Sequence, residues 1–253
     1  MNVLNDIVKY KKQNIQQHKE KMSIADLEKI IAENRFKHKS FFTLLESTNQ
    51  TPQVIAEIKK SSPSAGVIVE NYDPKMIMEK YQEKGFRNIS VLTEDKYFQG
   101  SNQDLELIKY NYDVATLQKD FIIDEWQVYQ AKAYGADCIL LISEILSGRE
   151  IKKFIGIATS LNMDVLLEFH KVTELPKILN SNLNIIGINN RNLSTLETNP
   201  LHALEIRDRF INEFRDHDIV AESGISSKLI IDKYLSNGIT KFLIGESLLK
   251  ESF

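Results

Sequence analysis

The pattern of hydrophobic and polar positions changes near residue 50 of this chain. From there on, short apolar runs alternate with longer segments whose apolar residues recur every three or four positions, the spacing of amphipathic helices. The apolar runs predict strands at 54–59, 88–92, 114–119, 137–142, 163–168, 184–189, 218–222 and 240–244. The segments between them predict helices at 74–84, 101–110, 124–135, 147–161, 172–180, 200–213 and 226–236.

The predicted strands are apolar along most of their length, as the runs ILLIS and DVLLEF show. Such strands are typical of a parallel sheet that is covered on both faces. Gly85, Gly135 and Gly238 stand where a helix ends shortly before the next strand, a position that favours glycine. Strict alternation of eight strands with helices favours a closed barrel over an open doubly wound sheet. The predicted fold class is therefore α/β, a (β/α)8 TIM barrel.

Residues 1–50 are expected to form helices that pack on this barrel as an extension. Apolar groups occur at 3–8 and again at 41–45. Between them, Ser23 is the candidate N-cap of a segment with apolar residues at helical spacing: Ile24, Leu27, Ile30 and Ile31. We interpret 1–253 as a single (β/α)8 barrel domain, with 1–50 as its helical extension.

Composition and charge are those of an ordinary globular protein. The net charge of −3 comes from interspersed charges of both signs, which argues against a nucleic-acid or membrane-surface partner. No segment is long and apolar enough to span a bilayer, and the N-terminus lacks the apolar core of a secretory signal. The single cysteine, Cys138, excludes an internal disulfide and fits a reducing compartment. We expect a cytoplasmic protein.

Ionisable and polar residues gather where the predicted strands end, which is where the active site of such a barrel lies. Glu57 and Lys59 share one face of the first strand, because successive strand residues face opposite ways. Lys119 ends the third strand and Glu168 the fifth. The later strands end in Asn189 and Arg191, in Glu222 and Ser223, and in Gly245 followed by Glu246. The strand starts are simpler: Asn88, Asp137, Asp164, Asn184 and Thr240.

Each of these residues also has a structural interpretation. Glu57 and Lys59 can form an ion pair at the barrel rim, and Lys119 can extend its ammonium to solvent. An unpaired Glu168 in its apolar run would have a raised carboxyl pKa, which suits a general acid or base. If the two lysines lie close together, each is expected to lower the pKa of the other. Arg191 suits a ligand carboxylate or phosphate as well as a neighbouring side chain.

Two glycine turns indicate a phosphate site. Gly224 follows the seventh predicted strand and Gly245 the eighth, and each leads into a helix whose N-terminal amides favour an anion. A plain turn is the alternative for each glycine. The histidines at 18, 38, 170, 202 and 217 lack metal-ligand spacing, so no metal site is expected. No GxGxxG or GxxxxGK[ST] motif occurs, so no nucleotide cofactor is expected.

The segment VIAEIKKSSPSAGVI resembles the signature of the indole-3-glycerol phosphate synthase family, in which Glu is followed two residues later by Lys and then by Ser-Pro-Ser or Ser-Pro-Thr. The likeness continues in order through SVLTEDKYFQGS, LQKDFIIDEWQVYQAKAYGAD, LLEFHKVTEL, IIGINNRNLSTLE, VAESGI and FLIGESLL. It implies a barrel enzyme of tryptophan biosynthesis. The implied reaction cyclises 1-(2-carboxyphenylamino)-1-deoxyribulose 5-phosphate with loss of CO2 and water, without cofactor or metal. Members of the family commonly work as monomers.

The resemblance also implies a role for each matching residue. Lys119 stands at the general acid and Glu168 at the general base, while Lys59 assists dehydration and Glu57 orients the lysines. The implied substrate-binding positions are Ser62, Phe98, Asn189, Arg191, Glu222 and Ser223, and the implied phosphate-binding positions are Gly224, Gly245 and Glu246. Tyr97 and Phe98 belong to the loop that covers the aromatic ring of the substrate. Some members have Ser where this chain has Glu246. The resemblance therefore implies that backbone binding of the phosphate survives in this chain, whereas a contact from a serine hydroxyl does not.

Two other functions remain open on the sequence. One is a different phosphate-substrate barrel, either an isomerase or an aldolase that forms a Schiff base on Lys119 or Lys59. The other is a catalytically silent barrel that binds a phosphorylated metabolite or a partner protein. The intact set of Lys59, Lys119 and Glu168 favours the synthase.

Overall fold

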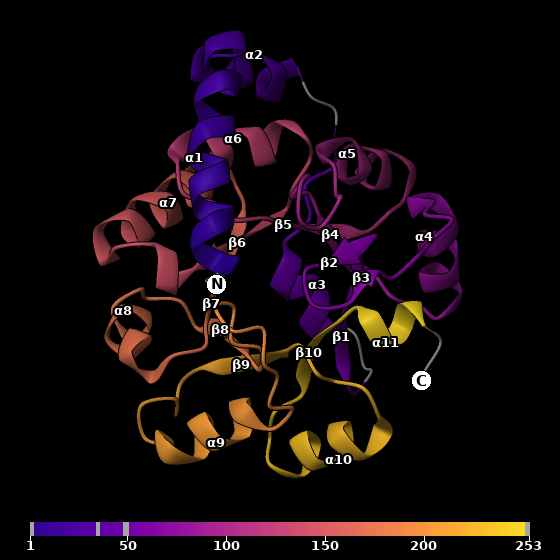
Figure 1. Cartoon of the computed structure of the whole chain (residues 1–253), viewed down its shortest axis with the longest axis vertical. Helices are drawn as coiled ribbons and strands as arrows, with labels where there is room; N and C mark the ends of the chain where they lie inside the picture. The colour runs from indigo at the N-terminus through magenta and orange to yellow at the C-terminus, as the bar shows by residue number, and fades with distance from the viewer. Residues whose placement is uncertain (1–2, 34–35, 48–50, 251–253) are drawn as a thin grey trace.

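The computed structural model describes residues 3–33, 36–47 and 51–250 of the chain. Within them, parallel strands close a barrel in the order β1-β10-β9-β8-β7-β6-β5-β4 (Figure 1). The strands are β1 Gln53–Ile58, β4 Asn88–Leu92, β5 Ala115–Lys119, β6 Cys138–Ile142, β7 Asp164–Phe169, β8 Ile185–Asn189, β9 Asp218–Glu222 and β10 Lys241–Ile244. Every predicted strand is confirmed within one residue at either end. A small antiparallel pair, β2 Ser61–Ser62 and β3 Gly66–Val67, was not predicted.

Helices follow the strands and form the outer layer of the barrel. They are α4 Pro74–Glu83, α5 Asn102–Asn111, α6 Glu125–Ala133, α7 Gly148–Ser160, α8 Leu175–Leu179, α9 His202–Arg209, α10 Lys228–Ser236 and α11 Glu246–Leu249. Short 3-10 turns lie at η1 Ser143–Ile145 and η2 Val172–Glu174, so the helix predicted at 172–180 is divided into η2 and α8.

Local sequence explains where many of these helices begin and end. Side chains that precede the first turn accept hydrogen bonds from its free amides, which stabilises the start: Asp73, Ser101, Asp124, Ser147 and Ser227. Gly85, Gly135 and Gly238 have positive φ angles of 79°, 90° and 79° just after helices, as predicted.

Two hydrophobic layers hold the barrel together. Side chains on one face of each strand point into the barrel and those on the other face pack under the helices, so the strands are apolar on both faces. The inner layer includes Ile55, Leu117 and Leu166. Cys138 is also part of it and is fully buried.

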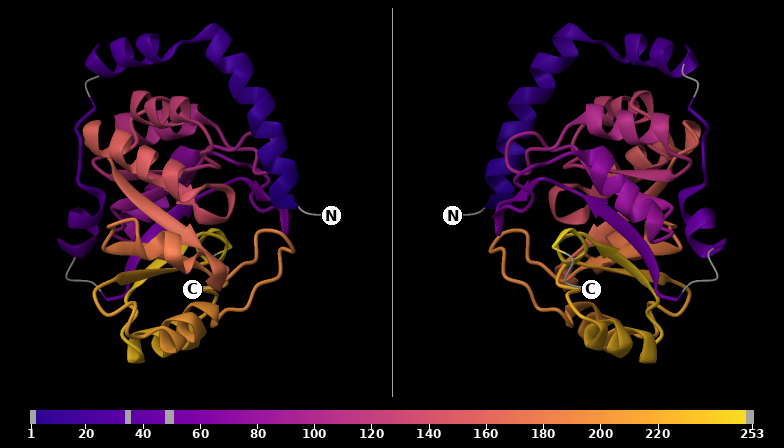
Figure 2. Two further views of the ribbon diagram at one scale, coloured as in Figure 1. Left: turned by 90° about the vertical axis from the view of Figure 1, so that its left-hand side faces the viewer. Right: turned by 90° about the vertical axis from the view of Figure 1, so that its right-hand side faces the viewer.

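The N-terminal extension wraps around one side of the barrel from end to end (Figure 2). It consists of α1 Val3–Lys21, α2 Ile24–Glu33 and α3 Phe41–Ser47. Helix α1 reaches the C-terminal ends of the strands, α2 packs on α6, and α3 packs on β1, β4 and β5. Ser23 caps α2 as predicted, because its Oγ accepts from the Asp26 amide at 3.2 Å while Asp26 accepts from the Ser23 amide at 3.1 Å.

Polar residues at the strand starts fasten the extension to the N-terminal end of the barrel. Asp164 accepts hydrogen bonds from the amides of Phe41 and Phe42, at 2.6 and 3.3 Å. Asn88 donates to the carbonyl oxygen of Phe41 at 2.7 Å. These residues are therefore part of the anchoring of α3, a role that the sequence did not reveal.

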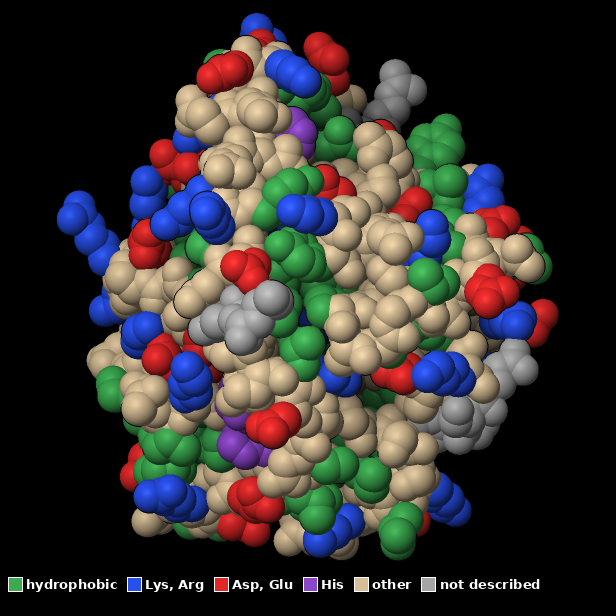
Figure 3. Space-filling model, viewed as in Figure 1, with side chains coloured by type: hydrophobic (Ala, Val, Ile, Leu, Met, Phe, Trp, Pro, Cys, Tyr) green, Lys and Arg blue, Asp and Glu red, His purple; other side chains and the backbone are tan. Residues whose placement is uncertain are grey.

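The surface carries charges of both signs. Lys, Arg, Asp and Glu side chains are interspersed over the face seen in Figure 3. Among the described residues, no helix combines the length and the apolar character needed to cross a membrane.

Candidate active site

A cavity of about 390 Å³ opens at the C-terminal ends of the strands. Most of the residues predicted for the site line it: Glu57, Lys59, Ser62, Phe98, Lys119, Glu168, Asn189, Arg191, Ser223, Gly224, Gly245 and Glu246. Glu222 is fully buried beside it and is not among the lining residues. The barrel thus brings together side chains that lie far apart in the sequence.

Glu57 joins the two lysines of the site. Its Oε1 lies 2.6 Å from Nζ of Lys59, and its Oε2 lies 3.3 Å from Nζ of Lys119. Burial disfavours the charged carboxylate, yet the two ammonium groups outweigh burial and lower the pKa of Glu57 from 4.5 to about 2. Glu57 is therefore ionised across the physiological range and holds both lysines on one side of the cavity.

Lys119 is surrounded by carboxylates. Besides Glu57, its Nζ has Glu222 Oε2 at 3.6 Å. Burial lowers the pKa of Lys119, but the charges of Glu57, Glu222 and Glu168 outweigh burial and raise that pKa above its usual 10.5. The pKa of Lys119 is thus raised and not lowered as expected for two neighbouring lysines, because the surrounding carboxylates outweigh burial.

Glu168 and Glu222 form the deepest acidic part of the site. Glu168 Oε1 accepts a hydrogen bond from Asn189 at 3.3 Å, whereas its Oε2 and both oxygens of Glu222 are buried without a hydrogen-bond partner among the described residues. Burial raises the pKa of Glu168 above 4.5, as predicted. Burial and then the charge of Glu168 raise the pKa of Glu222 well above 4.5. These carboxyl groups are suited to accept and return a proton.

Gly187 makes the approach of these two carboxyl groups possible. It lies on β8, between Glu168 on β7 and the strand β9 that ends in Glu222, and it is paired in register with Glu168. A Cβ atom at position 187 would overlap Oε1 of Glu222 and crowd Cβ of Glu168. The prediction from sequence missed Gly187, since nothing in the run IIGIN shows which neighbouring strands carry acidic side chains.

Asn189 and Arg191 line the cavity from the end of β8. The Arg191 amide donates to Oδ1 of Asn189 at 2.9 Å, which fixes the start of the loop. Nη1 of Arg191 donates to the carbonyl oxygen of Leu196 at 3.3 Å. The remaining donors of the guanidinium group suit an anionic ligand.

The loops after β1, β9 and β10 complete the polar end of the cavity. Ser62 Oγ accepts from the Ala65 amide at 3.2 Å and shapes the loop after β1. Ser223 and Gly224 have positive φ angles of 64° and 69°. Position 245 needs a glycine, because a Cβ atom there would overlap Oε1 of Glu57. The carboxylate of Glu246 is paired with Lys250 at 2.6 Å.

The other end of the cavity is apolar. Phe98 lies 6.0 Å from Phe121, measured between ring centroids, and both line the cavity. Val3 and Ile7 of α1 line it too, which the sequence did not reveal because helix α1 precedes the barrel. Tyr97 is not among the lining residues; it packs edge-on against Tyr10 with centroids 6.3 Å apart. Of the two aromatic residues predicted in this loop, Phe98 is the one that lines the cavity.

The fold and the site define a (β/α)8-barrel enzyme equipped for acid–base chemistry. Among the described residues, no group of three or more His, Cys, Asp or Glu side chains is arranged to hold a metal ion.

Comparison with known proteins identifies the family to which the chain belongs. The sequence model described as indole-3-glycerol phosphate synthase matches residues 4–252. The protein of that name from Aliarcobacter butzleri is 41% identical over 98% of this chain and 94% of its own length. The one from Campylobacter jejuni is 36% identical over 98% of this chain and 95% of its own. This chain belongs to the indole-3-glycerol phosphate synthase family, which consists of carboxy-lyases of tryptophan biosynthesis.

A solved structure supports the fold alone. A designed, cube-shaped porous protein cage, made by fusing symmetric oligomeric domains, matches with a TM-score of 0.56. The match has 14% sequence identity and covers 79% of this chain and 64% of that one.

Proposed function

We propose that this protein cyclises 1-(2-carboxyphenylamino)-1-deoxyribulose 5-phosphate to indole-3-glycerol phosphate, with loss of CO2 and water, by general acid–base catalysis. The observation that carries the proposal is the position of Lys119. Its ammonium lies 3.3 Å from Glu57 and 3.6 Å from Glu222, in a cavity that Glu168 also lines. A proton donor and candidate proton acceptors therefore face the same space.

The two ends of the cavity match the two ends of this substrate. The apolar end, with Phe98 and Phe121, suits the aromatic ring. The loops after β9 and β10, with Gly224 and Gly245, suit the phosphate group. This orientation places the sugar carbonyl between them, within the part of the cavity lined by Lys119 and Glu168.

The first step forms the new carbon–carbon bond. The ring carbon that carries the carboxylate attacks the carbonyl carbon, and negative charge develops on the carbonyl oxygen. We assign Lys119 as the acid that protonates this oxygen, because its raised pKa keeps it fully protonated at neutral pH. The bond to the carboxylate then breaks, CO2 leaves, and its electron pair restores the aromatic ring.

The second step removes water. The hydroxyl group made in the first step takes a proton from an acid and leaves as water. A base removes a proton from the adjacent CH2 carbon, which is bonded to the nitrogen, and a double bond forms between the two carbons. We assign Glu168 as the base, since its buried carboxyl has a raised pKa, and Lys59 as the group that assists the departure. Glu57 orients both lysines through its two oxygens. Ser62, Asn189, Arg191, Glu222 and Ser223 are assigned to substrate binding, and Gly224, Gly245 and Glu246 to the phosphate.

A fluorescence assay for indole-3-glycerol phosphate formation tests the proposal. We expect Lys119→Ala and Glu168→Gln to fold normally and to lose activity by at least a factor of about 100, which is typical for removal of a general acid or base. The exposed Lys153 serves as the control, and Lys153→Ala should retain full activity. Full activity in Lys119→Ala would refute the assigned acid.

Two further measurements separate this reaction from its alternatives. Borohydride reduction in the presence of substrate should leave no covalent lysine adduct, whereas an adduct would support a Schiff-base aldolase. The acid limb of the pH profile of kcat/KM should lie above pH 4.5, because the pKa of the Glu168 carboxyl is raised and the base works only when deprotonated.

We also propose that the chain acts as a single-domain monomer in the cytoplasm, without nucleic-acid or membrane partners. The packing of the extension along the barrel supports the single domain. Light scattering of the purified protein tests the monomer, and a mass of two chains would contradict it.

A further inference from the structure

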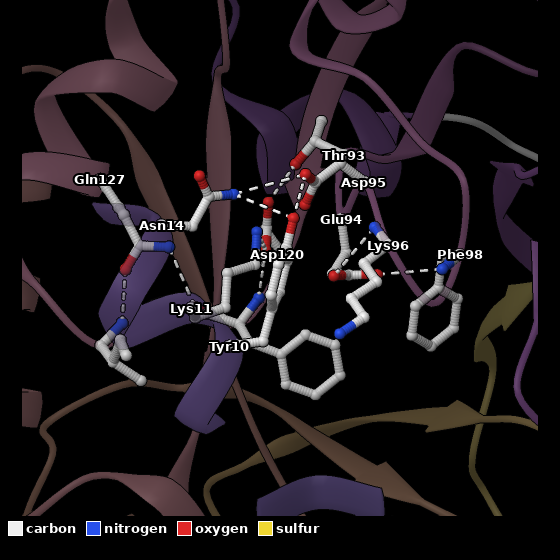
Figure 4. Close-up of polar contacts among 12 residues, drawn as sticks. Tyr10, Lys11, Asn14, Thr93, Glu94, Asp95, Lys96, Phe98, Asp120 and Gln127 are labelled. Atoms are coloured by element: carbon white, nitrogen blue, oxygen red, sulfur yellow. Dashed lines mark hydrogen bonds and ion pairs between the residues drawn. The ribbon is translucent and has the colours of Figure 1, made fainter. Parts of the chain in front are cut away.

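Lys11 is a buried lysine on the inner face of α1. Only 7% of its surface is exposed, and its ammonium lies 2.6 Å from Oδ1 of Asp120 (Figure 4). A buried lysine is costly unless it is paired, so this ion pair fixes the position at which α1 meets the barrel. The reaction proposed above does not use it.

Asp120 connects three elements through its carboxylate. Besides Lys11 of α1, it accepts a hydrogen bond from Thr93 Oγ1 at 2.7 Å, at the end of β4. It also accepts from the Phe121 amide at 2.7 Å, at the end of β5. Asp120 directly follows Lys119, so the carboxylate that receives α1 belongs to the same strand end as the proposed acid.

The position of α1 decides part of the cavity wall. Val3 and Ile7 precede Lys11 by eight and four residues, so all three lie on one face of the helix. Val3 and Ile7 line the apolar end of the cavity, and Lys11 anchors the next turn of the same helix face. The ion pair therefore sets how far these two side chains reach over the cavity.

The loop that carries Phe98 is held beside this anchor. The buried carboxylate of Glu94 accepts hydrogen bonds from the amides of Lys96, Tyr97 and Phe98, at 3.2, 2.6 and 2.9 Å (Figure 4). Tyr10, next to Lys11, donates to Oδ2 of Asp95 in the same loop at 2.6 Å. The two sides of the apolar end are thus fastened to each other.

We propose that Lys11 and Asp120 are positioning residues for the aromatic ring of the substrate. Their buried ion pair holds α1 at the distance at which Val3 and Ile7 close the apolar end of the cavity against the ring. Neither residue is assigned a chemical step. This inference rests on the proposed function, because the ring belongs to its substrate.

A second ion pair on α1 provides a matched control. Near the other end of the helix, Nζ of Lys19 lies 3.0 Å from Oδ2 of Asp124. This pair also joins α1 to the barrel, but both side chains are partly exposed, at 36% and 32%, and neither lines the cavity of the site. Replacing Lys19 removes an ion pair from the same helix without changing the anchor next to the cavity.

Steady-state kinetics of the full-length protein test the proposal. We expect Lys11→Met to raise KM about tenfold, because Val3 and Ile7 would then contact the aromatic ring less closely and the substrate would bind more weakly. We expect kcat to change by less than about twofold. Lys19→Met should leave both unchanged. The double variant Lys11→Met/Asp120→Asn should raise KM no further than Lys11→Met, because both substitutions remove the same ion pair. The double variant also leaves no unpaired buried charge. Unchanged KM in Lys11→Met, or an equal rise in Lys19→Met, would overturn the proposal.

Hydrogen exchange provides a readout that does not depend on activity. Amides of residues 3–10 should exchange faster in Lys11→Met than in the wild type, and those of the barrel strands should not. Equal exchange at 3–10 would overturn the proposal even if the wild type lacked the proposed activity. A wild type that makes no indole-3-glycerol phosphate would instead refute the proposed function and leave the exchange test of the anchor intact.

Discussion

The ammonium of Lys119 lies 3.3 Å from Oε2 of Glu57, and the two residues stand at the C-terminal ends of different strands, β5 and β1. The other oxygen of the Glu57 carboxylate lies 2.6 Å from Nζ of Lys59. Among the charges around Lys119, that of Glu57 contributes most to the raised pKa of the lysine. The protonation state of the proposed acid is therefore set by a residue on another strand.

Glu57→Gln is expected to lower the pKa of Lys119, because burial then disfavours the ammonium with less opposition from negative charge. The basic limb of the pH profile of kcat/KM, which reports loss of the acid's proton, should move to lower pH. Kinetics between pH 7 and the alkaline end of the stable range measure it. Glu125→Gln, on the surface of α6, is the control and should leave the limb in place. An unchanged limb in Glu57→Gln would mean that Lys119 is not the group that titrates.

Gly187→Ala should reduce kcat about a hundredfold, since the added Cβ would displace the carboxyl groups of Glu168 and Glu222 and small misplacements in an active site cost that much. Gly156, on α7, has open space where its Cβ would stand. Gly156→Ala should therefore keep full activity and raise the melting temperature slightly, as alanine favours a helix over glycine. Kinetics and thermal melts of both variants make the comparison. A fully active Gly187→Ala would show that the spacing of the two carboxyl groups is not needed.

Lys109→Met should destabilise the protein without affecting catalysis. Nζ of Lys109 lies 2.5 Å from Oδ2 of Asp137 at the N-terminal end of the barrel, and both side chains are buried, with 3% and 1% exposed. Removing one partner of a buried pair costs about 3 kcal/mol, which lowers the melting temperature of a protein of this size by roughly 6 to 12 °C. Because the pair lies far from the cavity, KM and kcat should stay within about twofold of the wild type. A large change in KM would show coupling between the two ends of the barrel.

Local pattern was enough to predict the barrel. The strands could be located because parallel strands covered on both faces are apolar throughout. The helix ends could be located because helix starts favour Ser, Thr, Asp and Asn, and the position after a helix favours glycine. The helix predicted at 172–180 was less accurate, since the local pattern did not show that a 3-10 turn precedes α8. Helix α1 was predicted only in part, because its burial pattern includes Lys11, whose partner Asp120 lies in the barrel.

The sequence by itself determined which residues stand at the ends of the strands, and hence most of the candidate site residues, because strand order along the chain fixes which groups face the C-terminal end of a closed barrel. It also determined the family, through motifs that occur in order along the chain. Only the tertiary structure decided how these groups act on one another. The raised pKa of Lys119, the space that Gly187 leaves for two carboxyl groups, and the closure of the cavity by α1 all depend on distances between segments far apart in the chain. Electrostatic and steric effects depend on those distances, which no local pattern of residues encodes.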